Sequence, residues 1–251
     1  MRDPAFFTGT MESGLTETPR LDDEAPTPAP AIPAVMLWSG GKDSMLALHR
    51  VLSEGGYKIE SLVTTVTSGY NRISMHGVRL ENLHAQAESL GLPLTIARIS
   101  PGSSNGQYED AMILCLVQFA AKGIKHVICG DLFLADIREY RERLFKRVGM
   151  QGVYPLWQRD TRKLADEFIG TGYKAALCCV NPRVVPDTIA GRDFDDALLA
   201  ELPESCDPCG ENGEFHSFVY DGPLFKTPVK IVRGQTVVRD GFAFTDLIPA
   251  D

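Results

Sequence analysis

Strand and helix signals alternate along the chain from Ile32 onward, and this alternation constrains the fold more than any other feature. Short apolar or β-branched runs predict strands, and runs with apolar residues every three to four positions predict helices. The predicted strands span 35–38, 58–67, 92–99 and 125–130. The predicted helices between them span 42–54, 79–91 and 108–123. Strands joined through helices need crossover connections, so we predict an α/β fold with a parallel, Rossmann-like sheet and helices on both faces.

The first predicted strand runs into its helix through the loop Ser-Gly-Gly-Lys-Asp-Ser. Glycines let the backbone approach a ligand closely, and the unsatisfied N–H groups of a helix start favour an anion. Because its two glycines are adjacent, the loop fits neither the Walker A pattern nor the dinucleotide-binding fingerprint. A glycine-rich turn that only caps the helix is the alternative, which the place after the first strand disfavours. The candidate phosphate ligands are Ser39, Gly40, Gly41, Lys42, Asp43 and Ser44.

A second candidate contact lies at the end of the fourth predicted strand, at Gly130 and Asp131. Ligands of parallel sheets bind at the carboxyl ends of the strands, so we expect these residues to contact the same nucleotide. Arg138 and Arg141 follow in a run with helical spacing. They would reach phosphates or a substrate carboxylate; a solvated helix face is the alternative interpretation.

The chain is predicted to have three parts. Residues 1–32 are rich in proline and acids and lack a periodic apolar face, which predicts a disordered tail. Residues 33–148 form the predicted nucleotide-binding domain. Residues 149–251 form a smaller α+β substrate-binding domain, whose end is predicted to be a β-meander with a turn at Arg233-Gly234. The other elements expected in this last part are a helix over 160–172 capped by Asp160 or Thr161, a strand over 173–180 and a helix over 193–203.

The stretch 206–225 is dense in glycine, proline and acidic residues and is the second candidate site. If a strand begins at Glu214, then Glu214 and His216 point to the same face, because side chains alternate along a strand. Glu211 and Asn212, with Gly213 between them and the strand, would reach the same pocket from the preceding turn. An acidic pair there would bind an ammonium-bearing substrate, ammonia or a metal ion.

Charge and composition exclude several classes of protein. The 251 residues carry a net charge of −8, of which the first 32 residues contribute −4 through six acids and two bases. Neither part has the basic excess of a protein that binds nucleic acid through its phosphates, so we expect no DNA partner. No apolar run approaches the roughly 18 residues that span a bilayer, and no signal peptide is evident, which predicts a cytoplasmic protein without a membrane partner. Cys206 and Cys209 lack the second pair that a structural zinc site needs.

Six segments together resemble a known family. SGGKDS resembles the PP-loop of the ATP pyrophosphatases. The other five resemble the diphthine–ammonia ligases: ISMHGVR (73–79), QAESLGLPL (86–94), GDLFLADIREYRE (130–142), VYPLW (153–157) and DPCGENGEFHSFVYDGPLF (207–225). The resemblance covers residues 34–245. Asn212 stands where the archaeal and eukaryotic pattern has glycine. This departure resembles the bacterial branch of the family and leaves the identity of the carboxylic acid substrate open.

The resemblance implies a HUP-type nucleotide domain and a reaction that uses ATP and Mg²⁺. A carboxylate would be adenylated with release of pyrophosphate, and ammonia would then displace AMP to form an amide. The implied catalytic residues are Lys42, Asp43, Glu211 and Glu214, and Asp43 is also the implied Mg²⁺ ligand. The implied substrate contacts are Asn212, Gly213, His216, His76 and Arg141. The carboxylate would be carried by a protein or by a small molecule, and a homo-oligomer is left open.

Two other functions fit part of this pattern. A tRNA-modifying PP-loop enzyme would use paired cysteines such as Cys206 and Cys209, but the acidic chain disfavours a tRNA substrate. A regulatory ATP-binding module would need only the first site, whereas the cluster at Glu211–His216 indicates a second one.

Overall fold

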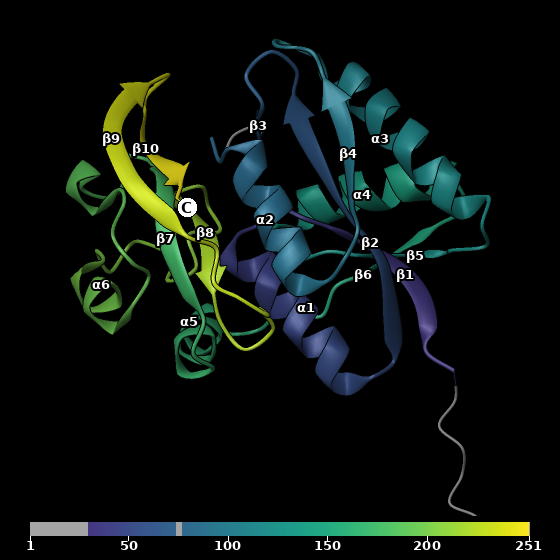
Figure 1. The fold of residues 1–251 in the computed structure, drawn as a ribbon, viewed down its shortest axis with the longest axis horizontal. Helices are drawn as coiled ribbons and strands as arrows, with labels where there is room; N and C mark the ends of the chain where they lie inside the picture. The colour runs from purple at the N-terminus through teal and green to yellow at the C-terminus, as the bar shows by residue number, and fades with distance from the viewer. Residues whose placement is uncertain (1–29, 74–76, 251) are drawn as a thin grey trace, which may run out of the picture. The chain divides into compact units, whose positions relative to one another are not determined.

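A computed structural model describes residues 30–73 and 77–250. Its first sheet has five parallel strands in the order β4-β2-β1-β5-β6 (Figure 1). A short strand, β3, pairs antiparallel with the end of β2. The bounds are β1 Ile32–Leu37, β2 Tyr57–Thr67, β3 Arg72–Ile73, β4 Leu94–Ile99, β5 His126–Ile128 and β6 Gln151–Val153. The strand order reverses between β1 and β5, which is where ligands bind in doubly wound sheets.

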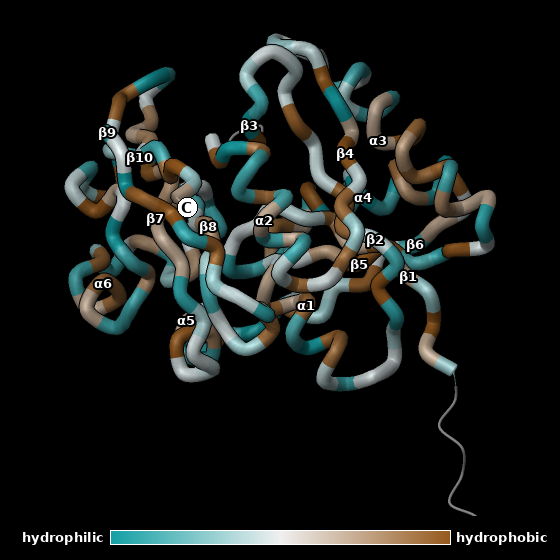
Figure 2. Tube along the Cα trace, in the orientation of Figure 1, coloured by the Kyte–Doolittle hydropathy of each residue, from teal (hydrophilic) through white to brown (hydrophobic). Residues whose placement is uncertain are grey.

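Helices cover both faces of this sheet, as predicted. Side chains alternate along a strand, so neighbours on β1 enter different cores: Met36 packs with α1 and α2, and Val35 packs with α3 and α4. The trace coloured by hydropathy shows apolar residues along the strands of this sheet (Figure 2). The helices are α1 Lys42–Glu54, α2 Leu80–Leu90, α3 Asn105–Ala120 and α4 Ala135–Arg147. The α/β prediction is therefore confirmed.

The C-terminal part contains an antiparallel sheet in the order β8-β7-β10-β9. Its strands are β7 Lys174–Val180, β8 Phe215–Asp221, β9 Ile231–Arg239 and β10 Phe242–Pro249, and its helices are α5 Thr161–Gly170, the 3₁₀ turn η1 Asp187–Ile189 and α6 Asp196–Glu201. Asp160 caps α5, because its carboxylate accepts a bond from the Lys163 N–H at 2.9 Å. The N-cap prediction for Asp160 is therefore confirmed.

The predicted turn at Arg233-Gly234 is wrong. Both residues lie inside β9, and the chain reverses at Asp240-Gly241 instead. Asp240 and Gly241 have φ values of 52° and 83°, and two consecutive positive φ values define the two-residue hairpin turn that Asp-Gly favours. Gly234 lies beside an irregularity in the register of β9 with β10, which is the usual role of a glycine inside a strand.

No helix among the described residues is long and apolar enough to cross a membrane. The predicted disordered tail lies at residues 1–32, of which 1–29 are outside the described residues.

Candidate functional site

The loop from Ser39 to Gly41 joins β1 to α1 at the point where the strand order reverses. Gly40 has a φ of 76°, and a Cβ on it would come within 2.8 Å of the buried Leu83 side chain. Gly130 follows the end of β5 and lies so close to α1 that a Cβ there would be 3.0 Å from the Asp43 carbonyl and the Ser44 nitrogen. These positions need glycine, because only a bare backbone allows the loop, the helix start and the end of β5 to meet.

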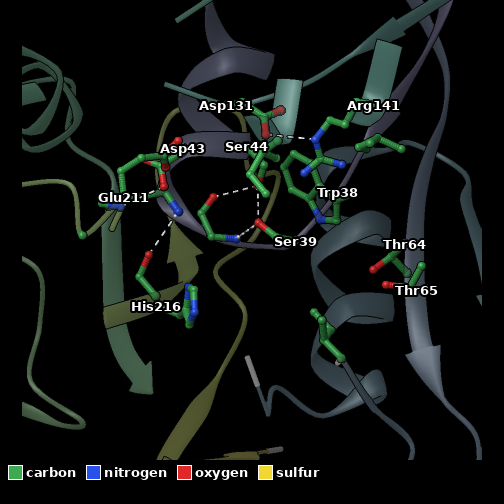
Figure 3. A pocket seen from close by; sticks show the side chains of 18 of the residues that line it. Trp38, Ser39, Asp43, Ser44, Thr64, Thr65, Asp131, Arg141, Glu211 and His216 are labelled. Atoms are coloured by element: carbon green, nitrogen blue, oxygen red, sulfur yellow. Dashed lines mark hydrogen bonds and ion pairs between the residues drawn. The ribbon is translucent and has the colours of Figure 1, made fainter. Parts of the chain in front are cut away.

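Hydroxyl groups organise the loop (Figure 3). The Ser39 and Ser44 hydroxyls lie 3.1 Å apart, and Ser39 also accepts a bond from the Gly41 N–H. Ser44 donates to the Gly41 carbonyl at 2.9 Å. Gly41 is the N-cap of α1 and supplies no side-chain cap, so the positive end of the helix dipole is directed at this loop. Helix start and hydroxyls together form a site suited to a phosphate group.

Lys42 lines the cavity, and its amine is held there by several contacts. Its side chain is buried, and its amine pairs with Asp43 Oδ2 at 2.8 Å and donates to the Cys209 carbonyl. The amine also lies over the rings of Phe194 and Phe215, at 5.7 and 5.4 Å from their centroids. Burial alone would lower the pKa of this amine, but the Asp43 carboxylate together with smaller contributions from neighbours such as Glu211 raises the pKa. Lys42 therefore ties the loop to the C-terminal part as a fixed cation.

Asp131 and Arg141 form a second ion pair at the cavity wall, with 2.9 Å between Asp131 Oδ1 and Arg141 Nε. The Asp131 side chain is only 8% exposed and that of Arg141 27% exposed. Burial opposes the charge of Arg141, yet Asp131 more than compensates and raises the pKa of the guanidinium. Arg141 thus faces the cavity with its charge paired. Arg138 instead lies over the rings of Tyr154 and Trp157, outside the cavity.

Glu211 reaches the cavity from the loop before β8. Its Oε1 accepts a bond from the Leu132 N–H at 2.9 Å, which links this loop to the residue that follows Asp131. Burial raises the pKa of Glu211 to about 7, with a further contribution from the negative charge of Asp43. The Leu132 N–H and the Lys42 charge oppose that rise. A carboxyl group that titrates near neutral pH is suited to proton transfer.

The other predicted residues of this stretch divide into two groups. His216 lines the cavity, with its neighbours Phe215 and Ser217. Glu214 does not: it is buried behind the loop, where its Oε1 accepts bonds from the Asp207 N–H and the Asn212 side-chain amide. The strand begins at Phe215 and Glu214 belongs to the preceding turn, so of this predicted pair only His216 lines the cavity. Gly213, at a φ of 84°, shapes the same turn. His76 lies outside the described residues.

The two loops open onto one cavity of about 680 Å³. The sequence interpretation missed much of its wall, including Trp38 at the end of β1 and Thr64 and Thr65 near the end of β2. The same rule that located Gly130, that ligands lie at the carboxyl ends of strands, would have found these three residues. Residues from α3 and α4 also line it, and the sequence analysis assigned none of them to the site: Asn105, Tyr108, Met112, Asp136, Ile137 and Tyr140.

Cys206 and Cys209 are buried free thiols. Their sulfur atoms donate to carbonyls, Cys206 to Asp207 and Cys209 to Thr161. Burial raises the pKa of Cys206 to about 12 and also raises that of Cys209, so both are protonated at neutral pH. Among the described residues, no three acidic, histidine or cysteine side chains converge into a metal-binding group.

A glycine loop at the switch point of a doubly wound sheet, joined to an antiparallel C-terminal sheet, defines a two-sheet α/β protein with a PP-loop-like site. The Diphthamide synthase N-terminal domain matches residues 32–152, and the Diphthamide synthase C-terminal domain matches residues 160–246. The chain therefore belongs to the diphthamide synthase family.

Relatives from animals and yeast are similar over most of this chain. The diphthine–ammonia ligase of Rattus norvegicus is 28% identical over 234 residues, covering 83% of this chain and 86% of that protein. That of Danio rerio is 29% identical over 233 residues, covering 84% and 90%. That of Schizosaccharomyces pombe is 26% identical and aligns with 80% of this chain but 36% of its own length. Among solved structures, the U34-tRNA thiolase NcsA from Methanococcus maripaludis aligns with a TM-score of 0.35 and 15% identity over 58% of this chain and 59% of its own.

Proposed function

We propose that this protein is an ATP-dependent, amide-forming ligase of the diphthine–ammonia ligase type. It would cleave ATP to AMP and pyrophosphate, transfer AMP to a carboxylate, and let ammonia displace AMP. The observation that carries the proposal is that the phosphate-suited loop and the Glu211 loop open onto the same cavity. A carboxylate is a poor electrophile until one of its oxygens belongs to a good leaving group, so activation and amide formation need adjacent sites.

In this proposal the loop 39–44 binds the β and γ phosphates as the leaving group. The Ser39 and Ser44 hydroxyls and the start of α1 would donate to phosphate oxygens. Gly130 and Asp131 would contact the same nucleotide from the end of β5, where they border the loop. Arg141, held by Asp131, would orient the substrate or a phosphate from the cavity wall.

The charges of the cavity fit a magnesium ion. Lys42 and Arg141 are each already paired with an aspartate, so they leave little free positive charge for a triphosphate. Mg²⁺ is commonly held by one or two carboxylates together with substrate phosphates, and a carboxylate oxygen of Asp43 would serve here. The ion would neutralise charge on the departing pyrophosphate.

On the acceptor side, Glu211 would take the proton that ammonia loses as the amide forms, because its pKa of about 7 allows both protonation states near neutral pH. His216 would contact the carboxylate substrate from β8. Glu214, Asn212 and Gly213 would act indirectly, by setting the shape of the turn that presents Glu211.

The relatives are named for diphthine, so a diphthine-bearing elongation factor is the first carboxylate to test. The proposed ligase, as its full chain, is incubated with the diphthine-bearing elongation factor, labelled ATP, magnesium chloride and ammonium chloride. The nucleotide products are then separated. We expect AMP and pyrophosphate in equal amounts and a mass change that matches carboxylate to amide. Formation of ADP and phosphate would contradict the proposal. AMP formation only with a different acid, such as a free amino acid or dicarboxylate, would keep the chemistry and change the substrate.

A further inference from the structure

One face of α2 is polar and yet completely buried. Asn82 and Gln86 are 0% exposed and Ser89 is 6% exposed. These three residues recur every three to four positions, so they lie on one side of the helix. Each donates to a backbone carbonyl of the C-terminal part: Asn82 to Leu247, Gln86 to Val219 and Ser89 to Thr227. This polar face is the α2 seam.

Gln86 differs from its two neighbours in the α2 seam because it also contacts the site. Its Oε1 accepts the indole N–H of Trp38 at 2.8 Å, and Trp38 lines the cavity. Its Nε2 donates to the Gly40 carbonyl at 3.0 Å and to the Val219 carbonyl at 2.6 Å. The Val219 N–H in turn donates to the same Gly40 carbonyl at 2.9 Å. A single carboxamide thus joins a cavity wall, the left-handed glycine of the loop and strand β8.

We propose that Gln86 is a positioning residue, which sets the geometry of the loop 39–44 relative to β8 and therefore relative to His216 and Glu211. The proposal rests on the function proposed above. Strand β8 contacts the loop a second time, where the Ser217 hydroxyl accepts from the Lys42 N–H at 3.2 Å. With Val219 fixed by Gln86 and Ser217 fixed by Lys42, the register of β8 against the loop is determined at two points. His216 directly precedes Ser217 on β8, so its place in the cavity follows from that register.

The chemistry of the three contacts requires an amide. An indole N–H is only a donor and the two carbonyls are only acceptors, so the residue between them must offer one acceptor and two donors. Glutamine provides this set. Glutamate would keep the Trp38 contact but direct lone pairs at two carbonyls. Methionine would keep the length, but the Trp38 N–H would lose its acceptor and the Gly40 and Val219 carbonyls would each lose the amide donor. Asparagine carries the same carboxamide as glutamine, but its side chain is one methylene shorter.

The α2 seam supplies a matched control. Asn82 is as deeply buried as Gln86 and also bridges α2 to the C-terminal sheet, but its Leu247 contact lies away from the loop. Asn82→Leu therefore removes a contact of the same kind without touching Trp38 or Gly40. If Gln86 served only the stability of the fold, Gln86→Glu and Asn82→Leu would have the same effect on kcat, on Trp38 emission and on hydrogen exchange.

Four proteins are compared in a Trp157→Phe background, which leaves Trp38 as the single tryptophan: the parent, Gln86→Glu, Gln86→Met and Asn82→Leu. The assay measures AMP formation, Tm, Trp38 emission and hydrogen exchange of the peptide 38–46. We expect both Gln86 variants to reduce kcat about tenfold or more while KM for ATP changes less, because a misplaced loop affects the reacting geometry most. Asn82→Leu should lower Tm comparably and keep kcat within about twofold.

The spectroscopic readouts separate this proposal from the proposed function. We expect Gln86→Glu and Gln86→Met to shift Trp38 emission and speed exchange over 38–46, and Asn82→Leu to do neither. Unchanged emission and exchange in a folded Gln86 variant would overturn the positioning role, whichever nucleotide product the parent forms. Equal kcat loss in the Asn82 and Gln86 variants at equal loss of Tm would overturn it as well. If the parent forms no AMP, the proposed function fails, and the Trp38 and exchange results still decide the role of Gln86.

Discussion

The two loops of the cavity differ in how they are built. The loop 39–44 follows a strand and opens a helix, and the bonds of its Ser39 and Ser44 hydroxyls lie within six consecutive residues. The loop 206–214 has no regular element directly before it, and its internal bonds run to the carboxylates of Asp207 and Glu214. Its position depends on the Lys42 amine at the Cys209 carbonyl and on the Leu132 N–H at Glu211. The first loop thus continues directly from a strand into a helix, whereas the second is placed against the first sheet by the contacts that Lys42 and Leu132 make with it. The predictions below test this difference.

The largest effect is expected for Gly40→Ala. At a φ of 76° the added Cβ costs about 1–2 kcal/mol in backbone strain, and it also meets Leu83 within 2.8 Å. The loop must then shift, and a displacement on the order of 1 Å is enough to reduce turnover about a hundredfold. The measurements are ATP affinity by calorimetry and the rate of AMP formation.

Gly55→Ala is the matched control for that variant. Gly55 has a nearly equal φ of 72° and nothing within 4 Å of the added Cβ, so it shares the strain but not the clash. It should lose stability and keep its affinity for ATP. Equal ATP affinity in the two variants would show that the close contact at Gly40 does not shape the site.

Lys42→Met is expected to have the next largest effect, on the second loop more than on the first. It leaves the partly buried Asp43 carboxylate without its cation, which should destabilise the fold by about 2–3 kcal/mol, below the full cost of a broken buried pair because Asp43 stays 28% exposed. Hydrogen exchange should rise over 206–211. Lys58→Met removes an exposed ion pair with Glu60 and should change neither the stability of the fold nor the hydrogen exchange over 206–211. Protection of 206–211 that survives in Lys42→Met would refute the assigned role.

These residues also show which parts of the molecule could be predicted from the sequence. The strand–loop–helix unit was predictable because its signals are local: an apolar run, adjacent glycines and a helical period that begins at Lys42. Contacts between distant segments left no such signal. Nothing near Gln86 indicates that Trp38 and Val219 will bond to it, and α2 was recognised only by its apolar face. The sequence predicts a shared face for Glu214 and His216 only if the strand starts at Glu214, whereas β8 starts at Phe215.

Glu211→Gln is expected to act on amide formation and its pH dependence. The active base is the carboxylate, which forms as the pH rises through about 7, so the wild-type rate should rise over that range at constant free ammonia. The rate of the variant should no longer rise with pH over this range, and it should be about a hundredfold lower than that of the wild type. Pyrophosphate release in the first turnover should persist, because the change lies on the acceptor side.

The same substitution has a predicted effect on stability. A folded-state pKa raised from 4.5 to about 7 means that the fold prefers protonated Glu211. The wild type therefore loses stability as the pH rises from about 4.5 through 7, whereas the glutamine variant does not. Urea unfolding at pH 5 and pH 8 should show a stability difference in favour of the variant that grows with pH. If the stability difference between the variant and the wild type were independent of pH, the pKa of Glu211 would not be raised in the folded state.

The smallest effect is expected for Cys206→Ala. The thiol is buried and protonated, and its sulfur donates only to a neighbouring carbonyl. Removing it should cost about 1 kcal/mol or less, since one small apolar atom is lost, and AMP formation should be unchanged. Cys206→Ser is the matched variant that keeps a donor. Loss of turnover in both folded variants would favour the sulfur chemistry of a tRNA-modifying enzyme instead.

The central claim is that the first loop splits ATP between the α and β phosphates before ammonia takes part. The direct test is a rapid-quench experiment with excess diphthine-bearing elongation factor, labelled ATP and magnesium chloride, without ammonium. We predict a burst of one pyrophosphate per protein molecule, with AMP carried on the acid, and steady turnover only when ammonium chloride is added. A burst of ADP, or a first turnover that releases pyrophosphate only in the presence of ammonium, would contradict the account.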